Sequence, residues 1–256
     1  MQTGLVLSGG GTKGMAHAGA LQYFDEIGLK IDLLAGASAG AMVAALYAGG
    51  YSPEEILRIF QKESFFSTSS ITFSKPGIVD SSKLANTFAR YFDEDDFSTL
   101  KIPLYVSATN MLKASADLFH EGPLIAPILA SSAFPLVVAP VEINGQLYND
   151  GGIMNHFPVE VAREHCDKVV GIYLTPVGEI EKKQYRSLRA VVERTFRLGR
   201  HASSVYKFGM CDVLINPDKL ADFGTFELSD KKMQQLFDIG YEAAKAQDEA
   251  LQKLLA

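Results

Sequence analysis

Two short apolar segments, each followed by a glycine-rich turn and a helical pattern, occupy the first 50 residues. Residues 4–8 read as a buried strand that leads into a turn and then into helical spacing over 15–27. Residues 33–35 repeat this arrangement, with a small-residue helix expected over 41–48. Of the 22 glycines in the chain, 11 lie in this stretch. Repeated strand–turn–helix units favour an α/β domain with a mostly parallel sheet, and the glycines mark the first place to look for a site.

The rest of the chain continues the same pattern. Strands are expected over 102–109, 137–143 and 168–174, and helices from Ser52 onward and over 81–92, 157–165, 182–201 and 230–255. No repeat, low-complexity tract or linker is visible in the sequence. We therefore expect a single domain over residues 1–256, with a helical C-terminal part over 180–256.

Charge, cysteines and the N-terminus exclude several classes of protein. The formal net charge of -6 argues against a nucleic-acid-binding protein. Two cysteines cannot form a disulfide scaffold, and no paired Cys/His spacing indicates a zinc site. The first residues lack the basic segment of a secretory signal, so we expect a cytoplasmic protein.

Two stretches without charge, residues 33–53 and 122–141, approach the length of a membrane span. The first is built largely of small residues, and the second contains four prolines, which a helix tolerates poorly. We expect both to be buried protein interior.

The first glycine cluster lies between an expected strand and helix. Gly9, Gly11 and Gly14 match the G-x-G-x-x-G pattern of dinucleotide-binding loops. That function requires an acid at the end of the second strand, whereas Asp32 precedes it. An oxyanion hole fits better, because it needs adjacent N–H groups without side chains in the way. A nucleotide-binding regulatory protein remains the alternative from another class.

The second cluster surrounds a serine. Gly36, Ser38 and Gly40 form G-x-S-x-G between a strand and a helix, which is the context of a nucleophile elbow. The flanking glycines relieve crowding at a sharp turn, and the helix that follows directs its positive dipole end toward the serine. The pattern predicts a nucleophilic Ser38.

A serine nucleophile requires a base. The histidine candidates are His17, His120, His156, His165 and His201. Asp150 follows a strand-like segment and precedes two glycines, Gly151 and Gly152, so its carboxylate could face a serine closely. Asp150 and His156 would also fit the Ser…Asp…His order of α/β-hydrolases, but there the nucleophile follows several strands. The residues alone leave both bases open.

Taken together, these elements resemble the patatin-like phospholipase family. The matching segments are residues 9–14, 36–40 and 150–152, and a fourth similar block covers 130–135. The resemblance spans about residues 4–175. Within the family, the chain is most similar to bacterial and neuropathy-target-esterase-like members. It implies a three-layer α/β/α fold with a mostly parallel central sheet.

The resemblance also implies a Ser–Asp dyad without histidine. Ser38 would be the nucleophile and Asp150 the general base, and the oxyanion hole would comprise Gly9, Gly10 and Gly11. Gly10 and Gly11 would supply the N–H groups while Gly9 shapes the turn. Further motif residues are Lys13, Gly14, Gly36, Gly40, Gly151 and Gly152. Lys13 stands at a helix start, which the helix dipole disfavours for a cation, so we expect it to anchor the loop.

The implied reaction is acyl-ester hydrolysis on phospholipids or lysophospholipids through an acyl-Ser38 intermediate. It needs no metal or cofactor. Because a carboxylate is a weak base for an alcohol, Asp150 is expected to be buried or to take the proton mainly in the transition state. A non-lipid carboxylesterase or acyltransferase would use the same chemistry, and a catalytically inactive binding module is a third possibility.

Two segments are candidates for lipid contact. Five apolar residues in a serine-rich stretch either form a mobile wall of an acyl pocket or belong to the core: Phe65, Phe66, Ile71, Phe73 and Ile78. Residues 182–200 carry seven basic side chains and one acid, with Leu188, Val192 and Phe196 at near-helical spacing. A basic amphipathic helix can lie on an anionic membrane, here the inner membrane surface. The alternative is a solvated helix face that pairs with acids of the protein body.

Overall fold

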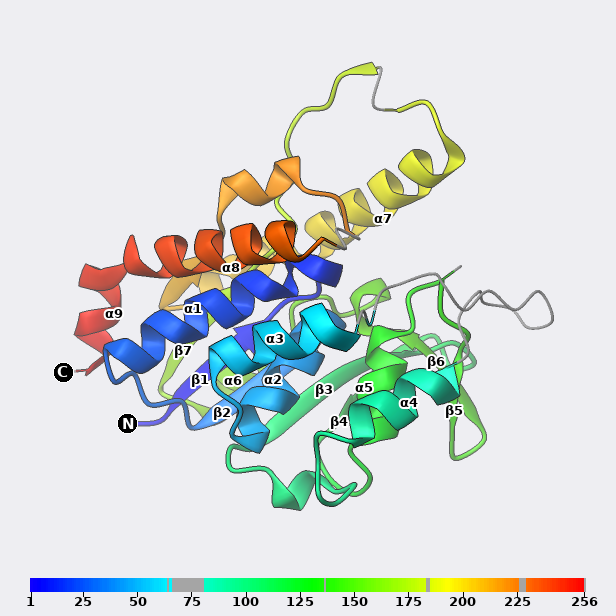
Figure 1. Cartoon of the computed structure of the whole chain (residues 1–256), viewed down its shortest axis with the longest axis horizontal. Helices are drawn as coiled ribbons and strands as arrows, with labels where there is room; N and C mark the ends of the chain where they lie inside the picture. The colour runs from blue at the N-terminus through cyan, green and yellow to red at the C-terminus, as the bar shows by residue number, and fades with distance from the viewer. Residues whose placement is uncertain (64, 66–80, 136, 183–184, 226–228, 256) are drawn as a thin grey trace.

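The computed structural model describes the whole chain except residues 64, 66–80, 136, 183–184, 226–228 and 256. In the described part, eight strands form one sheet with helices on both sides (Figure 1). The strands are β1 (Thr3–Leu7), β2 (Leu33–Ala37), β3 (Leu104–Asn110), β4 (Ser115–Phe119), β5 (Val141–Ile143), β6 (Gln146–Asp150), β7 (Lys168–Ile172) and β8 (Val213–Ile215). The helices are α1 (Met15–Glu26), α2 (Ala39–Gly49), α3 (Pro53–Glu63), α4 (Ser81–Ala89), α5 (Ile125–Ser132), α6 (Val159–His165), α7 (Leu188–Ser204), α8 (Asp230–Lys245) and α9 (Asp248–Leu255).

The sheet is parallel at its centre and antiparallel at one end. The strand order is β5-β6-β3-β2-β1-β7-β8, and β4 pairs with β3 outside this path. Parallel pairing joins β1 to β2 and β7, β2 to β3, and β7 to β8. Antiparallel pairing among the described strands involves β4, β5 and β6. The expected α/β fold with a mostly parallel sheet is confirmed.

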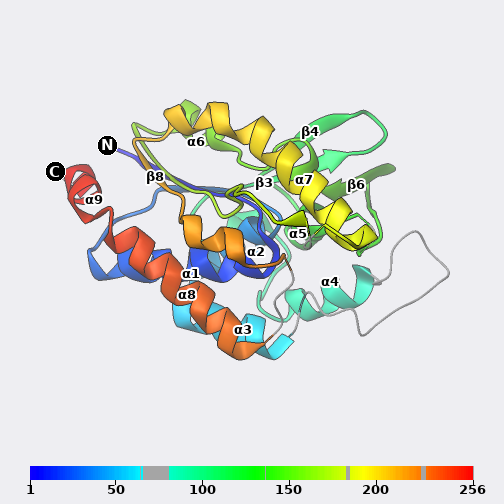
Figure 2. The same cartoon turned by 90° about the horizontal axis from the view of Figure 1, so that it is seen from above.

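Side chains of the central strands alternate between two cores, one on each face of the sheet. Leu5 and Leu7 of β1 belong to the larger core, which includes side chains of α1, α2 and α8. Val6, between them, belongs to a smaller core with Tyr173 and side chains of α6. Figure 2 shows α6 and α7 on one side of the sheet and α1, α3 and α8 on the other. Parallel strands are buried on both faces, and the result is the expected three-layer arrangement.

The second half of the chain differs from the expectation in several places. The structure adds two strands, β4 and β8, and the helix α5; because of β8, the part over 180–256 is not purely helical. Helix α7 begins later than expected because the Ser187 side chain caps it, accepting a hydrogen bond from the Ala190 N–H (3.1 Å). The single helix expected over 230–255 is broken into α8 and α9 at residues 246–247, where the sequence contains no glycine or proline.

Neither uncharged stretch forms one long helix. Residues 33–53 make up β2, α2 and the turns at their ends, and residues 122–141 contain the eight-residue α5. Throughout the described part of the chain, no helix has both the length and the apolar character needed to cross a bilayer.

Candidate active site

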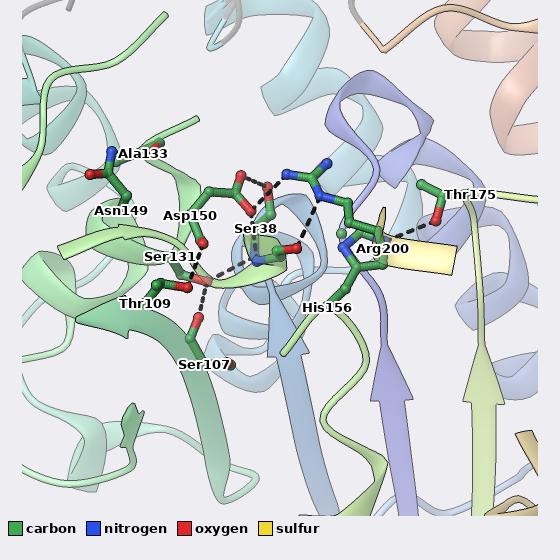
Figure 3. Close-up of polar contacts among 12 residues, drawn as sticks. Ser38, Ser107, Thr109, Ser131, Ala133, Asn149, Asp150, His156, Thr175 and Arg200 are labelled. Carbon is green, nitrogen blue, oxygen red and sulfur yellow. Dashed lines mark hydrogen bonds and ion pairs between the residues drawn. The ribbon is translucent and has the colours of Figure 1, made fainter. Parts of the chain in front are cut away.

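Strand β3 brings the ends of β2 and β6 together. On one edge of β3, Ala37 of β2 pairs with Ser107, and Asp150 of β6 pairs with the next residue, Ala108. The other edge of β3 carries β4. Because β2 runs parallel to β3 and β6 antiparallel, the two strands approach each other end to end. Ser38, the residue after β2, therefore faces Asp150, and its Oγ donates a hydrogen bond to Asp150 Oδ2 (2.8 Å; Figure 3).

Ser38 lies on a strained turn that neighbouring groups hold in place. Its φ of 54° is positive, which is uncommon for a residue with a side chain. The turn passes so close to β1 that a Cβ on Gly40 would lie 2.3 Å from the Leu7 carbonyl oxygen. The Ser38 N–H donates to Ser131 Oγ (2.8 Å), whose own hydroxyl donates to the Ser107 carbonyl (2.6 Å). Ser131 thus holds the elbow in place, and its Oγ is the acceptor for the Ser38 N–H.

The two oxygens of the Asp150 carboxylate have different partners. The residue is 1% exposed, and Oδ2 accepts the Ser38 hydroxyl. Oδ1 accepts from the Gly152 N–H (2.7 Å) and from Arg200 Nη2 (3.2 Å). The backbone is held as well, because Thr109 Oγ1 donates to the Asp150 carbonyl (2.9 Å). The carboxylate is therefore buried, ion-paired and directed at the serine.

The glycine-rich loop lies beside Ser38 and offers two backbone donors. Gly9 N–H donates to the His156 carbonyl (3.3 Å), which agrees with the expectation that Gly9 shapes the turn and leaves the donor role to Gly10 and Gly11. The N–H groups of Gly10 and Gly11 have no acceptor among the residues that the structure describes. Gly11 lines the same pocket as Ser38. The loop can therefore supply two N–H groups, one from Gly11, which lines the serine pocket, and one from Gly10, which lines the adjoining pocket.

The remaining motif residues surround this site. Lys13 is 1% exposed, and its Nζ donates to the Leu220 carbonyl (2.6 Å) in a short helix over Asp218–Asp222. Gly14 packs against Ala39 at the start of α2. A Cβ at Gly36 or Gly151 would approach backbone atoms to 2.8 Å or 2.0 Å. The motif thus serves close packing around the site as well as its chemistry.

Replacement of Gly11 by alanine is expected to destabilise the fold more than an ordinary glycine-to-alanine change. Gly11 has a φ of +61°, and a Cβ there would lie 2.2 Å from the Thr225 carbonyl oxygen. The matched control is Gly28→Ala, where φ is +69° but no atom lies within 4 Å. The control should cost about 1 kcal/mol of unfolding free energy through its backbone conformation alone. Urea denaturation would measure both variants, and equal losses would contradict a steric role for Thr225.

None of the five histidines bonds to the Ser38 hydroxyl or the Asp150 carboxylate, and all five lie in the described part of the chain. His156 borders the site, because a Cβ on Gly152 would meet both its Nδ1 and Asp150 Oδ1, but its Nε2 is directed at Thr175 Oγ1 (2.9 Å). Burial, and next the Arg200 charge, hold the pKa of His156 well below its usual value. The Ser…Asp…His arrangement considered from chain order is therefore not formed, and the serine contacts the carboxylate directly.

The other histidines have structural surroundings. His17 Nε2 lies 2.7 Å from the Ser8 carbonyl, and burial lowers the pKa of this imidazole to about 3. His120 and His165 pack against the ring of Tyr105, with centroids 4.7 and 5.6 Å away. His201 lies near aromatic rings of the smaller core.

Sequence reasoning missed Arg200. Residues 182–200 were expected to present their arginines to a membrane or to solvent. Instead Arg194 donates to the Gly178 carbonyl (2.8 Å), and Arg197 donates to backbone carbonyls of residues 221–223. Arg200 is 7% exposed and reaches Asp150. These three side chains face the protein body, so the expectation of a membrane-facing or solvated face is wrong for them, whereas Arg200 does pair with an acid of the body, Asp150. No sequence signal separates Arg200 from its basic neighbours.

A small pocket opens at Ser38 and Asp150. Its apolar wall includes Phe65, Phe134 and Val138. Phe65 also belongs to the larger core, as the alternative interpretation expects. The other members of the expected acyl wall lie outside the described residues: Phe66, Ile71, Phe73 and Ile78.

Comparison with curated proteins finds relatives of similar sequence. An uncharacterized NTE family protein of Mycobacterium tuberculosis is 32% identical over 173 residues, which cover 66% of this chain and 48% of that protein. Lysophospholipase NTE1 of Cryptococcus neoformans is 27% identical, with 70% of this chain and 11% of that protein covered. Human patatin-like phospholipase domain-containing protein 6 is 26% identical, with 94% and 20% covered. The chain thus spans about half of the mycobacterial relative and a fifth or less of the other two.

Solved structures share the fold at low identity. VipD from Legionella pneumophila matches with a TM-score of 0.57 and 17% identity, over 98% of this chain and 67% of that one. Human GIVD cytosolic phospholipase A2 matches with a TM-score of 0.53 and 11% identity, over 98% and 59%. The family model described as patatin-like phospholipase matches residues 5–163, which include the glycine loop, the serine elbow and Asp150. The chain belongs to the patatin-like phospholipase family.

Proposed function

We propose that this protein is a serine acyl-ester hydrolase of the phospholipase or lysophospholipase type. Ser38 is the nucleophile and Asp150 the general base. The observation that carries the proposal is the 2.8 Å hydrogen bond from Ser38 Oγ to a buried carboxylate oxygen of Asp150. Membership of the patatin-like phospholipase family supports the lipid substrate.

The reaction follows from this geometry. Ser38 Oγ attacks the ester carbonyl carbon while its proton passes to Asp150 Oδ2, and the N–H groups of Gly10 and Gly11 stabilise the oxyanion. Collapse of the intermediate leaves acyl-Ser38, and the departing alkoxide takes the proton from Asp150. Water then attacks the acyl-enzyme as Asp150 removes its proton. Return of this proton to Ser38 releases the fatty acid and restores the enzyme.

The pocket wall supports an acyl chain as the group that is transferred. Phe65, Phe134 and Val138 offer apolar surface beside Ser38, and burial of each chain methylene contributes about 0.8 kcal/mol. The test is a panel of lysophosphatidylcholine, phosphatidylcholine and a short-chain soluble ester, with released acid as the readout. Hydrolysis of the lipids supports the proposal. Hydrolysis of the soluble ester alone favours the non-lipid esterase, and acyl transfer to an added alcohol favours the acyltransferase.

The nucleotide alternative has less support from the site. Ser38 directly follows the second strand, whereas Asp32 precedes it, and the Asp32 carboxylate accepts from the Thr3 N–H (2.9 Å). Titration calorimetry with NAD and ATP tests this alternative, and micromolar binding would restore it.

We also propose that residues 1–256 act as one domain, because Arg200 of α7 reaches the site built by β2 and β6.

We also propose a peripheral membrane contact on the outer side of α7 and the segment before it. Lys182 and Arg186 are exposed there, together with Tyr185 (45%) and Leu198 (46%). Basic groups near an anionic membrane surface contribute about 1 kcal/mol each. Apolar side chains beside them can enter the interface.

Reversal of both charges, Lys182→Glu with Arg186→Glu, is expected to weaken binding to anionic vesicles at least about tenfold. The matched control reverses two exposed lysines elsewhere, Lys30 and Lys253, and so changes the net charge equally. Co-sedimentation at low salt measures both variants. Equal binding by the two double variants would contradict a localised contact.

A further inference from the structure

Arg200 occupies a buried position beside the site. Its guanidinium carbon lies 5.2 Å from the ring centre of Phe134 and 5.7 Å from that of Phe196. Nε donates to the Gly152 carbonyl (3.1 Å), and Nη2 donates to Asp150 Oδ1 (3.2 Å; Figure 3). The two rings and the two acceptors thus define both the position and the plane of the guanidinium.

The contacts of Arg200 determine which carboxylate oxygen is available to Ser38. Asp150 Oδ1 is held by Arg200 and by the Gly152 N–H, and Oδ2 is left to accept the serine hydroxyl. Rotation of the carboxylate would break these contacts. The arginine therefore restricts the rotation that would move Oδ2 away from the nucleophile.

Arg200 also supplies the positive charge that lies against the Asp150 carboxylate. Charge-assisted hydrogen bonds of this kind are stronger than those between neutral groups. The other cations near the site have other hydrogen-bond acceptors: Lys13 donates to the Leu220 carbonyl, and Arg197 to the carbonyls of residues 221–223. His156 is neutral because burial lowers its pKa.

Two other acidic groups lie close to the basic residues of this region. Glu193 of α7 lines a second small pocket, next to the first, that Arg200 also borders, but Arg200 makes its ion pair with Asp150. Lys207, on a short helix over Val205–Met210, pairs with Glu160 of α6 at 3.0 Å. Among the ion pairs of the described residues, Arg200 alone reaches the Asp150 carboxylate.

We propose that Arg200 is a positioning residue that keeps the Asp150 carboxylate directed at Ser38. The inference rests on the proposed hydrolase function. Arg200 lies beyond residues 5–163, which the family model matches, so α7 adds to the site from the C-terminal part of the chain.

The test measures kcat and KM separately for the full chain, with a soluble ester as substrate. In Arg200→Gln, kcat is expected to fall about tenfold to a hundredfold, while KM changes less than about twofold. Arg200→Lys retains the charge but cannot make both planar hydrogen bonds. Its kcat should lie between those of the wild type and Arg200→Gln.

The matched control is Arg194→Gln, which removes the same charge from the same helix but loses a contact to the Gly178 carbonyl. Its kcat and KM should stay within about twofold of those of the wild type. If Arg200→Gln does not fold, Arg200→Met keeps the packing between the two rings and gives the same readout. Thermal melting establishes folding before kinetics.

An unchanged kcat in folded Arg200→Gln would overturn the inference, and so would a loss that falls on KM alone. An equal loss of kcat in Arg194→Gln would also overturn it, because the effect would then be one of general charge. Absence of Ser38-dependent hydrolysis in the wild type would instead show that the proposed function has failed, and the inference with it.

Discussion

Substitution of Ser38 by alanine is expected to lower kcat for ester hydrolysis by at least about ten-thousandfold. The change removes the Oγ atom that forms the acyl-enzyme. A water molecule is not held at this position by the elbow, so it cannot replace the serine as nucleophile. The φ of 54° at Ser38 suits alanine no worse than serine, so the variant should fold. Released fatty acid measures the loss, and a melting temperature close to that of the wild type confirms the fold.

Ser131→Ala provides a graded comparison for this result. The change removes the hydroxyl that accepts from the Ser38 N–H and donates to the Ser107 carbonyl, but it leaves the nucleophile in place. We expect about a tenfold loss of kcat, far smaller than in Ser38→Ala. Similar losses in the two variants would indicate that the serine elbow matters for structure alone. Hydrolysis by folded Ser38→Ala would show that Ser38 is not the nucleophile.

Asp150→Asn is expected to lower kcat by about a thousandfold to ten-thousandfold, while the binding of substrate changes little. The amide preserves the shape of the carboxylate but cannot accept the serine proton. Its oxygen should turn toward the donors Gly152 N–H and Arg200 Nη2, and its NH2 would then face Ser38 as a donor. Steady-state kinetics with the soluble ester gives kcat and KM separately.

The comparison variant is His156→Gln. His156 is buried next to the glycine loop, but its ring has no hydrogen bond to either member of the dyad. We expect a loss of less than about tenfold. The opposite order, with Asp150→Asn active and His156→Gln inactive, would indicate a conventional triad and contradict the carboxylate base.

The serine elbow and the glycine loop could be predicted because their signals are local. A sharp turn after β2 needs small residues on both sides of Ser38, and adjacent N–H groups need the glycines of residues 9–11. The strand–turn–helix pattern predicted the parallel centre of the sheet for the same reason. Asp150 gave a weaker signal, a carboxylate before two glycines, and its assignment as base came from the family resemblance.

The arrangement of the dyad and the role of Arg200 could not be read from sequence. Ser38 and Asp150 meet because β2 and β6 share one edge of β3. The two residues are 112 positions apart in the sequence. Arg200 lies in a basic run whose composition equally suits a solvated or membrane-facing helix. Only the packing of α7 beside the site turns Arg194, Arg197 and Arg200 inward.

Short elements at the sheet ends were missed for a different reason. β8 comprises Val213–Ile215, too few residues to show a strand periodicity. β4 covers Ser115–Phe119 and its side chains are only partly buried, so its pattern resembles a polar loop. α5 contains Pro127, which argues against a helix in sequence but is tolerated here in the first turn.

The most direct test of the proposed hydrolase is to label the protein with a fluorophosphonate and locate the adduct by peptide mapping. The proposal predicts one adduct, on Ser38, in the wild type, much slower labelling in Asp150→Asn and none in Ser38→Ala. Reaction at another serine, or unchanged labelling of the Ser38→Ala variant, would contradict the assignment of Ser38 as the nucleophile that Asp150 activates.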